Sequence, residues 1–338
     1  MVYFDRRWDG ETGIGRFCRE TASRLVGIAP LPLAGNPASP LDCFRLTLFM
    51  LLNPRARVVS PGYSAPLMGL GRFILTIHDL NHIDTGYNSG FLKRIYYRVV
   101  LRRACRNAAH ILTVSEFSRQ RIIEWAAISP ERITCVGNGV SEAFLESAKN
   151  DTSRNASEGY LLSVGNRKGH KNEAAVVRCL AALSQYPKLR LVFTGKESED
   201  LGSLIDLHGL RERVEFKGPL TERALSACYR DAAMLVFPSF YEGFGLPAVE
   251  AMAVGCPVIA SDGTALGEVA GGASLGIDPR NDEAICSAVT RLIEDVDLRA
   301  QLKDLGLARS RMYSWSRVAQ NLDVAIGGWN RCVDAINK

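Results

Sequence analysis

The chain lacks the features that mark several classes of protein. Its nine cysteines form no Cys-x-x-Cys pair and have no companion histidines at metal-binding spacing, so neither a zinc module nor a redox motif is predicted. No apolar run reaches membrane-spanning length, and the longest candidate, Leu46 to Leu52, is far too short. The N-terminus has no apolar core of the length that a signal peptide needs. We therefore expect a cytoplasmic globular protein whose cysteines are small core residues.

Strong charge of one sign is also missing. With 41 Lys and Arg against 36 Asp and Glu, the net charge is only +5 over 338 residues. Nucleic-acid binding is the alternative from another functional class, and it predicts a platform of aromatic and basic side chains. Because no such platform is present in the sequence, we predict no nucleic-acid partner.

What the chain does contain is an alternation of short β-branched runs with longer amphipathic segments. In the first half the ranges 57–60, 73–77 and 110–114 are predicted strands, and 91–108 and 115–127 are predicted helices. A second series of strands follows, at 160–164, 189–193, 213–216, 234–237 and 257–260. This rhythm predicts an α/β fold with parallel sheets. The length favours two domains, and the polar stretch Lys149 to Gly159 is the best linker, so we predict a boundary near residue 155.

The most informative segment runs from Glu242 to Glu250, two carboxylates with seven residues between them. A buried strand precedes it, and Pro247 stands where a helix could begin. Gly243 and Gly245 would let a ligand approach the backbone, and a helix start favours an anion such as phosphate. The pattern predicts a binding site for a phosphorylated sugar. The alternative is a glycine-rich loop whose glutamates merely cap and solubilise a helix.

Three further motifs are weaker when taken singly. The range 165–172, Gly-Asn-Arg-Lys-Gly-His-Lys-Asn, follows a predicted strand and offers the cations that a diphosphate needs, although it could be a solvated basic loop. His78 ends another strand and could bind a sugar hydroxyl or move a proton, although a lone histidine is more often packed at a strand end. The range 13–16, Gly-Ile-Gly-Arg, is a glycine turn that opens a helix.

Taken together, these motifs resemble glycosyltransferase family 4, the retaining transferases that use nucleotide sugars. The resemblance covers nearly the whole chain and keeps the motif order. It implies the GT-B architecture, two facing Rossmann-like domains with parallel sheets and a cleft between them. On this basis we expect an acceptor-side domain at 1–155, a donor domain at 156–315, and a C-terminal helix at 316–338 that packs back on the first domain.

The resemblance also implies roles for single residues. Glu250 would hold the ribose hydroxyls, and Glu242 would bind the donor sugar beside the reacting carbon. Arg167 and Lys171 would grip the diphosphate, although His170 departs from the arginine that many relatives carry directly before the lysine.

Three positions would act through their backbone: Phe244, Gly245 and Leu246 would meet the sugar and the β-phosphate. Gly15 would close over the phosphates from the first domain, and His78 would contact the sugar and help orient the reaction. Glu242 and His78 are thus the predicted catalytic residues.

The implied reaction needs no cofactor and no bound metal, in agreement with the lack of an Asp-x-Asp motif at a strand end. Retention could proceed through a covalent intermediate or by front-face attack, which we favour. GDP-mannose is the expected donor, with UDP-glucose, UDP-N-acetylglucosamine or dTDP-rhamnose as alternatives. A sugar-nucleotide epimerase of similar architecture is a further alternative.

The expected acceptor is a saccharide, free or linked to polyprenyl diphosphate, in bacterial surface polysaccharide synthesis. The range 91–106 has six cations and no acid, with apolar residues at Phe91, Leu92, Ile95, Tyr96 and Val99. As an amphipathic helix it could lie on the inner face of the plasma membrane as a peripheral contact. Alternatively, it packs on its sheet and leaves a solvated basic face.

Overall fold

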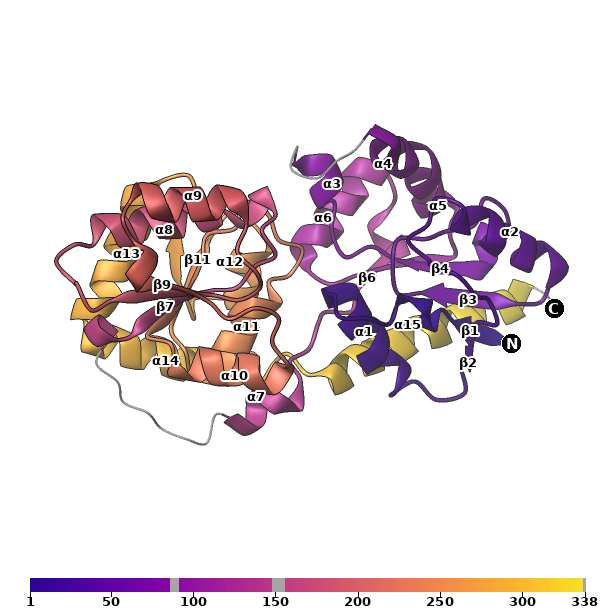
Figure 1. Cartoon of the computed structure of the whole chain (residues 1–338). Coiled ribbons are helices and arrows are strands. Elements are labelled where there is room, and N and C mark those ends of the chain that lie inside the picture. Colours follow the sequence, from indigo (N-terminus) through magenta and orange to yellow (C-terminus); the bar gives the residue numbers. More distant parts are fainter. Residues whose placement is uncertain (86–90, 148–155, 337–338) are drawn as a thin grey trace. The chain divides into compact units, whose positions relative to one another are not determined.

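The computed structural model describes residues 1–85, 91–147 and 156–336 (Figure 1). The chain forms two compact units, which we describe separately: unit 1 is Met1–Gly139 with Ser314–Lys338, and unit 2 is Val140–Tyr313. Within the described residues each unit contains one six-stranded sheet in which all neighbouring strands are parallel, and helices flank each sheet. The predicted α/β class with two parallel sheets is confirmed.

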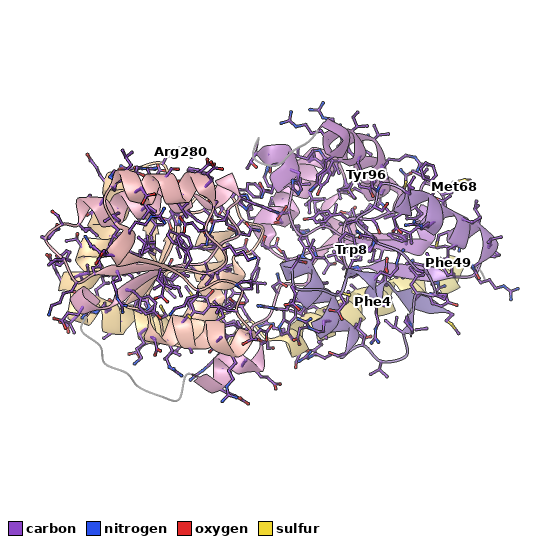
Figure 2. All side chains as sticks on the ribbon, viewed as in Figure 1. Phe4, Trp8, Phe49, Met68, Tyr96 and Arg280 are labelled. Atoms are coloured by element: carbon purple, nitrogen blue, oxygen red, sulfur yellow. The ribbon has the colours of Figure 1, made fainter. Side chains whose placement is uncertain are left out.

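The sheet of unit 1 has the strand order β2-β1-β3-β4-β5-β6. Of its central strands, Phe73–Thr76 is buried at every position and His110–Thr113 at its last three, as expected for a parallel sheet covered on both faces. Phe4 on β1 and Phe49 on the helix α2 (Asp42–Leu52) are both buried in this unit (Figure 2). The strands are β1 (Val2–Phe4), β2 (Ala29–Pro30), β3 (Arg57–Ser60), β4 (Phe73–Thr76), β5 (His110–Thr113) and β6 (Ile133–Cys135).

The helices of unit 1 include one predicted element that is interrupted. The predicted helix 91–108 consists of α4, a π-helical turn η3 and α5, while the predicted helix 115–127 is α6. The helical elements are η1 (Arg6–Trp8), α1 (Gly13–Ala22), α2 (Asp42–Leu52), η2 (Leu70–Arg72), α3 (Asn81–Asp84), α4 (Phe91–Tyr96), η3 (Tyr97–Leu101), α5 (Arg102–Asn107), α6 (Glu116–Ala126), η4 (Pro130–Arg132) and α15 (Trp315–Ile336).

In unit 2 the strand order is β12-β11-β10-β7-β8-β9. The chain starts at β7, proceeds outward through β8 and β9, and then crosses to β10 on the other side of β7. Ligands of open parallel sheets bind at the carboxyl ends of the strands where the order reverses in this way. The strands are β7 (Tyr160–Ser163), β8 (Arg190–Phe193), β9 (Val214–Phe216), β10 (Met234–Phe237), β11 (Val258–Ser261) and β12 (Leu275–Ile277).

Helices of unit 2 alternate with these strands. A single apolar core, which includes Val176 on α8, Phe193 on β8 and Val289 on α13, lies between the sheet and its helices. The helical elements are α7 (Glu142–Ser147), η5 (Ala156–Glu158), η6 (Gly169–Lys171), α8 (Glu173–Ala182), α9 (Glu199–Leu207), η7 (Arg211–Arg213), α10 (Glu222–Asp231), α11 (Leu246–Ala253), α12 (Ala265–Ala270), α13 (Asp282–Glu294) and α14 (Val296–Ser310).

The units divide earlier in the chain than the predicted boundary near residue 155. The division falls after Gly139 because α7 packs on unit 2. The Ser141 hydroxyl donates to Glu222 at 2.8 Å, and the Phe144 ring meets Tyr229 edge to face at 6.0 Å. Most of the predicted linker lies outside the described residues.

The last helix, α15, groups with unit 1, and the chain changes unit after Tyr313 rather than at the predicted residue 315. The Trp315 ring packs against Phe17 of α1 at 6.2 Å. The Asn321 side-chain amide donates to the Val136 carbonyl at 3.2 Å. Unit 1 is therefore built from two distant stretches of sequence.

Eight cysteines lie in the part of the chain whose side chains are described, and all eight are free thiols. Five of them are buried, in agreement with the expected role as small core residues. Within the same part of the chain, no helix combines the length and apolarity needed to cross a bilayer.

Candidate functional site

The reversal of strand order in unit 2 brings two predicted motifs together. The loop after β7 carries Lys171, and the loop after β10 carries Glu242. The Lys171 ammonium donates to Glu242 Oε1 at 2.7 Å and lies 5.1 Å from the centre of the Phe237 ring. The Phe240 backbone N–H donates to the His170 carbonyl at 2.7 Å, which ties the two loops together.

The pair of Lys171 and Glu242 is only partly buried. The side chains are 14% and 12% exposed, so a ligand can reach them while the surrounding protein limits screening by water. The two residues are 71 positions apart in the sequence. Their ion pair supplies one cation and one carboxylate at the carboxyl ends of adjacent strands.

α11 starts four residues after Glu242. Gly245 has a backbone φ of 97°, and a Cβ there would lie 2.1 Å from Leu266 Cδ2, so glycine is required on two counts. α11 begins at the next residue, Leu246, and Gly245, its N-cap, has no side chain to cap it. Because Pro247 has no N–H and the Ala248 N–H donates to the Gly245 carbonyl at 3.0 Å, this helix start offers an anion fewer than the usual four backbone N–H donors. Phe244 is buried, edge to face with Tyr313.

Glu250 lies one turn further along α11 and is 3% exposed. Its Oε2 accepts a hydrogen bond at 3.0 Å from the hydroxyl of Tyr229, a fully buried residue of α10. The sequence patterns did not single out Tyr229, because its position 21 residues before Glu250 belongs to no motif. The structure thus gives the buried carboxylate a fixed donor on one oxygen.

Arg167 has partners different from those of Lys171. Its guanidinium pairs with Glu173, donates to the Thr194 carbonyl, and donates to the Lys196 carbonyl at 2.8 Å. It also stacks over Phe193, 5.0 Å from the ring centre. Burial raises the pKa of Glu173, and the charge of Arg167 opposes this shift.

Glu173 is a second residue that motif reasoning missed. It begins α8 and touches Gly165, where a Cβ would lie 2.5 Å from Glu173 Oε1. Arg167 and Lys171, which were predicted to act together on a diphosphate, are therefore held by separate acids in this structure. The diphosphate role of Arg167 stays a prediction.

In unit 1, His78 is buried at the carboxyl end of β4. Its Nε2 is 2.8 Å from the Pro61 carbonyl, which can only accept, so Nε2 carries the proton. The ring packs edge to face on Phe17 at 5.0 Å. Burial lowers the pKa of His78 below its ordinary value near 6.5, although the bond to Pro61 and the nearby Asp79 act in the opposite direction. The imidazole is therefore neutral at pH 7, with Nδ1 as the acceptor atom.

Gly15 lies in the first turn of α1, where its N–H donates to the Thr12 hydroxyl at 3.1 Å. A Cβ at this position would lie 2.2 Å from the Gly10 carbonyl oxygen. The absence of a side chain thus has a local packing reason. The predicted closure of Gly15 over phosphates stays a prediction.

The basic segment 91–106 differs from the predicted amphipathic helix. Its inward face consists of Tyr97, Leu101 and Cys105, which are buried, whereas Ile95 and Val99 are exposed. The predicted apolar stripe through Ile95 and Val99 is thus not the face that packs on the sheet, and the described apolar side chains are divided between the two faces. Phe91 and Leu92 lie outside the residues whose side chains are described.

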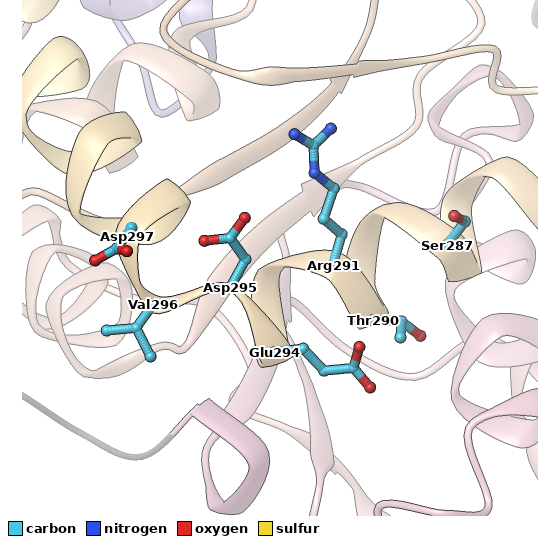
Figure 3. Close-up of a pocket in the computed structure, with 7 residues that line it drawn as sticks. All are labelled: Ser287, Thr290, Arg291, Glu294, Asp295, Val296 and Asp297. Atoms are coloured by element: carbon cyan, nitrogen blue, oxygen red, sulfur yellow. The ribbon is translucent and has the colours of Figure 1, made fainter.

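A hollow of about 690 Å³ lies where α13 ends and α14 begins (Figure 3). Asp295 on its wall caps α14 by accepting from the Leu298 N–H at 2.8 Å. None of the predicted site residues lines this hollow. Its residues are Ser287, Thr290, Arg291, Glu294, Asp295, Val296 and Asp297.

Comparisons with known proteins agree with this architecture. Residues 6–144 match the model of Glycosyltransferase Family 4, and residues 146–307 match that of Glycosyl transferases group 1. Together the two matches define the protein as a glycosyltransferase. The chain belongs to glycosyltransferase family 4.

Among its relatives is O-antigen chain mannosyltransferase B of Escherichia coli, 30% identical over 258 residues, which span 73% of this chain and 68% of that protein. Another is O-antigen chain mannosyltransferase RfbU of Salmonella typhimurium, 27% identical over 75% of this chain and 68% of the relative. WaaG, a glycosyltransferase involved in lipopolysaccharide biosynthesis, shares the fold with a TM-score of 0.75 and 16% identity, over 96% of this chain and 99% of that structure.

Proposed function

We propose that this glycosyltransferase transfers mannose from GDP-mannose, with retention of anomeric configuration, to a saccharide or a polyprenyl-diphosphate-linked saccharide in bacterial surface polysaccharide synthesis. The relatives named O-antigen chain mannosyltransferases support the sugar and the pathway class. The observation that carries the site is the ion pair of Lys171 with Glu242 beside the uncapped start of α11. Cation, carboxylate and helix start are the groups that a nucleotide sugar requires.

In this proposal the donor lies across the carboxyl ends of β7 and β10. Lys171 and the α11 start neutralise the diphosphate, while backbone groups of Phe244, Gly245 and Leu246 meet the β-phosphate and the sugar. Glu250, oriented by Tyr229, accepts from the ribose hydroxyls. Arg167 adds positive charge beyond Lys171. These residues take the role that a divalent ion has in other transferases.

Glu242 binds sugar hydroxyls in this scheme. With Oε1 bonded to Lys171, the other carboxylate oxygen is the acceptor for the sugar. In front-face attack, the acceptor hydroxyl attacks the anomeric carbon, the bond to the β-phosphate breaks, and the departing phosphate takes the hydroxyl proton. His78, neutral with Nδ1 as acceptor, would receive a hydrogen bond from the sugar.

A thermal-shift panel of GDP, UDP, dTDP and ADP tests the donor. A nucleotide that binds only the folded protein raises its melting temperature, and we expect the largest rise with GDP. A larger rise with UDP or dTDP would contradict GDP-mannose and favour the glucosyl, N-acetylglucosaminyl or rhamnosyl alternatives. Incubation of the matching sugar nucleotide without acceptor detects an epimerase, because an epimerase would convert the sugar.

Replacement of either partner of the ion pair tests the assigned roles. We expect Glu242→Ala to reduce transfer about 100-fold or more, a loss of about 2.7 kcal/mol of transition-state stabilisation, with GDP affinity nearly unchanged because Lys171 remains. We expect Lys171→Met to weaken GDP binding about tenfold, because the unpaired Glu242 carboxylate then faces the diphosphate. Calorimetric titration with GDP and a transfer assay measure the two effects.

The matched control is Lys168→Met, which removes an exposed cation from the same loop. We expect it to change GDP affinity less than threefold, since an exposed charge is screened by water and salt. If Lys168→Met and Lys171→Met weaken GDP binding equally, the loop acts only as a general basic surface and Lys171 has no specific role. Near-normal turnover of Glu242→Ala would exclude its catalytic role.

A further inference from the structure

A buried carboxylate lies against the loop that carries the two proposed diphosphate cations. Glu173 follows Lys171 by two positions, and its side chain is only 7% exposed. Its Oε2 accepts the backbone N–H of Arg167 at 3.1 Å, and its Oε1 is paired with the Arg167 guanidinium. The carboxylate also lies against Gly165. The loop before α8 therefore contacts Glu173 at two of its residues.

The conformation of Arg167 depends on these contacts. Its φ of 61° lies in the left-handed region, which is unfavourable for a residue with a side chain. The hydrogen bond from its N–H to Glu173 stabilises this turn. The guanidinium lies over two stacked rings, 5.0 Å from the centre of Phe193 and 5.3 Å from that of Phe216. Glu173 therefore positions both the backbone and the side chain of Arg167.

Each of the two proposed diphosphate cations already has an acid partner. Arg167 is paired with Glu173, and Lys171 is paired with Glu242. A diphosphate brings negative charge that competes with both acids for the same cations. Burial raises the pKa of Glu173, and the charges of Arg167 and Lys171 oppose this shift. An anion that neutralises those charges removes the opposition, so it favours the protonated carboxyl group.

We propose that Glu173 is a positioning residue that takes up a proton when the donor diphosphate binds. The proton comes from the solvent, forms an O–H bond on one carboxylate oxygen, and returns to the solvent when the nucleotide leaves. The neutral carboxyl group still accepts the Arg167 N–H, so the turn is retained while the charge of Arg167 becomes available to the diphosphate. This inference rests on the proposed function, because it needs a diphosphate beside Arg167 and Lys171.

The direction of the pH dependence follows from the uptake. A ligand that binds together with a proton binds more weakly as the pH rises. Other titratable groups occur on the elements around Glu173 and have to be distinguished from it. On α13, which packs against α8, Asp282 is paired with Arg178 at 2.5 Å. The others are His170 and Glu242 in the two site loops, Lys196 after β8 and Glu199 at the start of α9.

Calorimetric titration of the full-length protein with GDP-mannose tests the proposal. Titrations at pH 7 in Pipes, Hepes and Tris, which differ in ionisation enthalpy, give the number of protons taken up per donor bound. A sugar nucleotide is used because both of its phosphates are esterified and neither titrates near pH 7. We expect an uptake of about half a proton and an affinity about tenfold lower at pH 8 than at pH 6.

Glu173→Gln should abolish the uptake, because the amide does not titrate but keeps an acceptor oxygen for the Arg167 N–H. We expect this variant to bind GDP-mannose at pH 8 about as tightly as the unaltered protein does at pH 6. A residue that served packing alone would instead weaken binding at every pH when replaced. Arg167→Met is the second variant, and it should also abolish the uptake, because Glu173 without its cation is protonated before the donor binds.

The matched control is Glu199→Gln, which makes the same change at the first residue of α9, where the glutamate is exposed. It should retain the uptake and the pH dependence, as should His170→Gln and Glu242→Gln. The inference fails if the donor binds without proton uptake or if Glu173→Gln leaves the uptake unchanged.

The donor itself is tested separately. If the thermal-shift panel favours UDP or dTDP, the same titrations use UDP-glucose or dTDP-rhamnose, and only the choice of GDP-mannose is overturned. If none of these sugar nucleotides binds, the proposed function fails and this inference fails with it.

Discussion

At the scale of single residues, Gly245 shows how one position can serve both folding and binding. Its positive φ and the contact that a Cβ would make with Leu266 both require glycine. We expect Gly245→Ala to lower the free energy of unfolding by about 2–4 kcal/mol, from backbone strain and overpacking together, and to weaken GDP binding. Urea denaturation measures the first effect and calorimetric titration the second.

Gly263→Ala is the control for this substitution. Gly263 is exposed, and a Cβ there would meet no atom within 4 Å. We expect Gly263→Ala to change the free energy of unfolding by less than about 0.5 kcal/mol. Equal effects of the two substitutions would show that the conformation of Gly245 is not special.

His78 should make stability depend on pH. Because burial lowers its pKa in the folded protein, the unfolded chain binds a proton first as the pH falls. The stability contributed by neutral His78 is therefore complete above the unfolded value near 6.5 and is lost below it, by up to about 1.4 kcal/mol per pH unit. Urea denaturation between pH 7.5 and 5 measures this slope.

His78→Gln should flatten the profile, since the amide does not titrate. Burial also lowers the pKa of His110. The His110→Gln variant therefore separates the two contributions. If His78→Gln leaves the slope of stability against pH unchanged, a group other than His78 is responsible for the pH dependence.

At the scale of elements, α10 orients a carboxylate on α11. We expect Tyr229→Phe to lower the free energy of unfolding by about 1–3 kcal/mol, because it removes a hydrogen bond from the buried Glu250. GDP affinity should fall several-fold if Glu250 holds the ribose.

Tyr186→Phe offers a close comparison, since that hydroxyl also donates to a glutamate, Glu294, at 2.7 Å, but on the surface. We expect Tyr186→Phe to leave the free energy of unfolding and the GDP affinity nearly unchanged, because water replaces an exposed hydrogen bond. If Tyr229→Phe leaves GDP affinity unchanged while lowering stability, Glu250 is a structural residue.

Elements whose signals are local could be predicted from the sequence. β10 and α11 were predicted from an apolar run followed by glycines and Pro247, since strand and helix starts depend on adjacent residues. The segment 91–108 was predicted as one helix, but it is interrupted by the π-helical turn Tyr97–Leu101. Such a turn responds to packing, here of Tyr97 and Leu101 in the core, and hydrophobic spacing alone does not reveal it.

At the scale of the whole molecule, the proposed donor contacts can be assigned to units by hydrogen exchange. GDP should slow exchange in the loops 164–172 and 238–246 of unit 2, while the buried strands β3 and β4 of unit 1 stay unchanged. Mass spectrometry of peptic fragments with and without GDP measures this. Protection at 10–16 with GDP-mannose would support the role predicted for Gly15, and unchanged exchange there would contradict it.

The sequence by itself determined the α/β class, the two parallel sheets and the family, because strand and helix periodicity and the Glu-x7-Glu motif are properties of neighbouring residues. Tertiary structure decided the pairing of Lys171 with Glu242, the donor from Tyr229 to Glu250, and the capture of Arg167 by Glu173. The first contact joins the loops after β7 and β10, which the strand order makes neighbours. The second joins the packed helices α10 and α11, and the third depends on how one loop folds back on α8. The division of the chain after Gly139 likewise follows from the packing of α7 on α10, which no local pattern encodes.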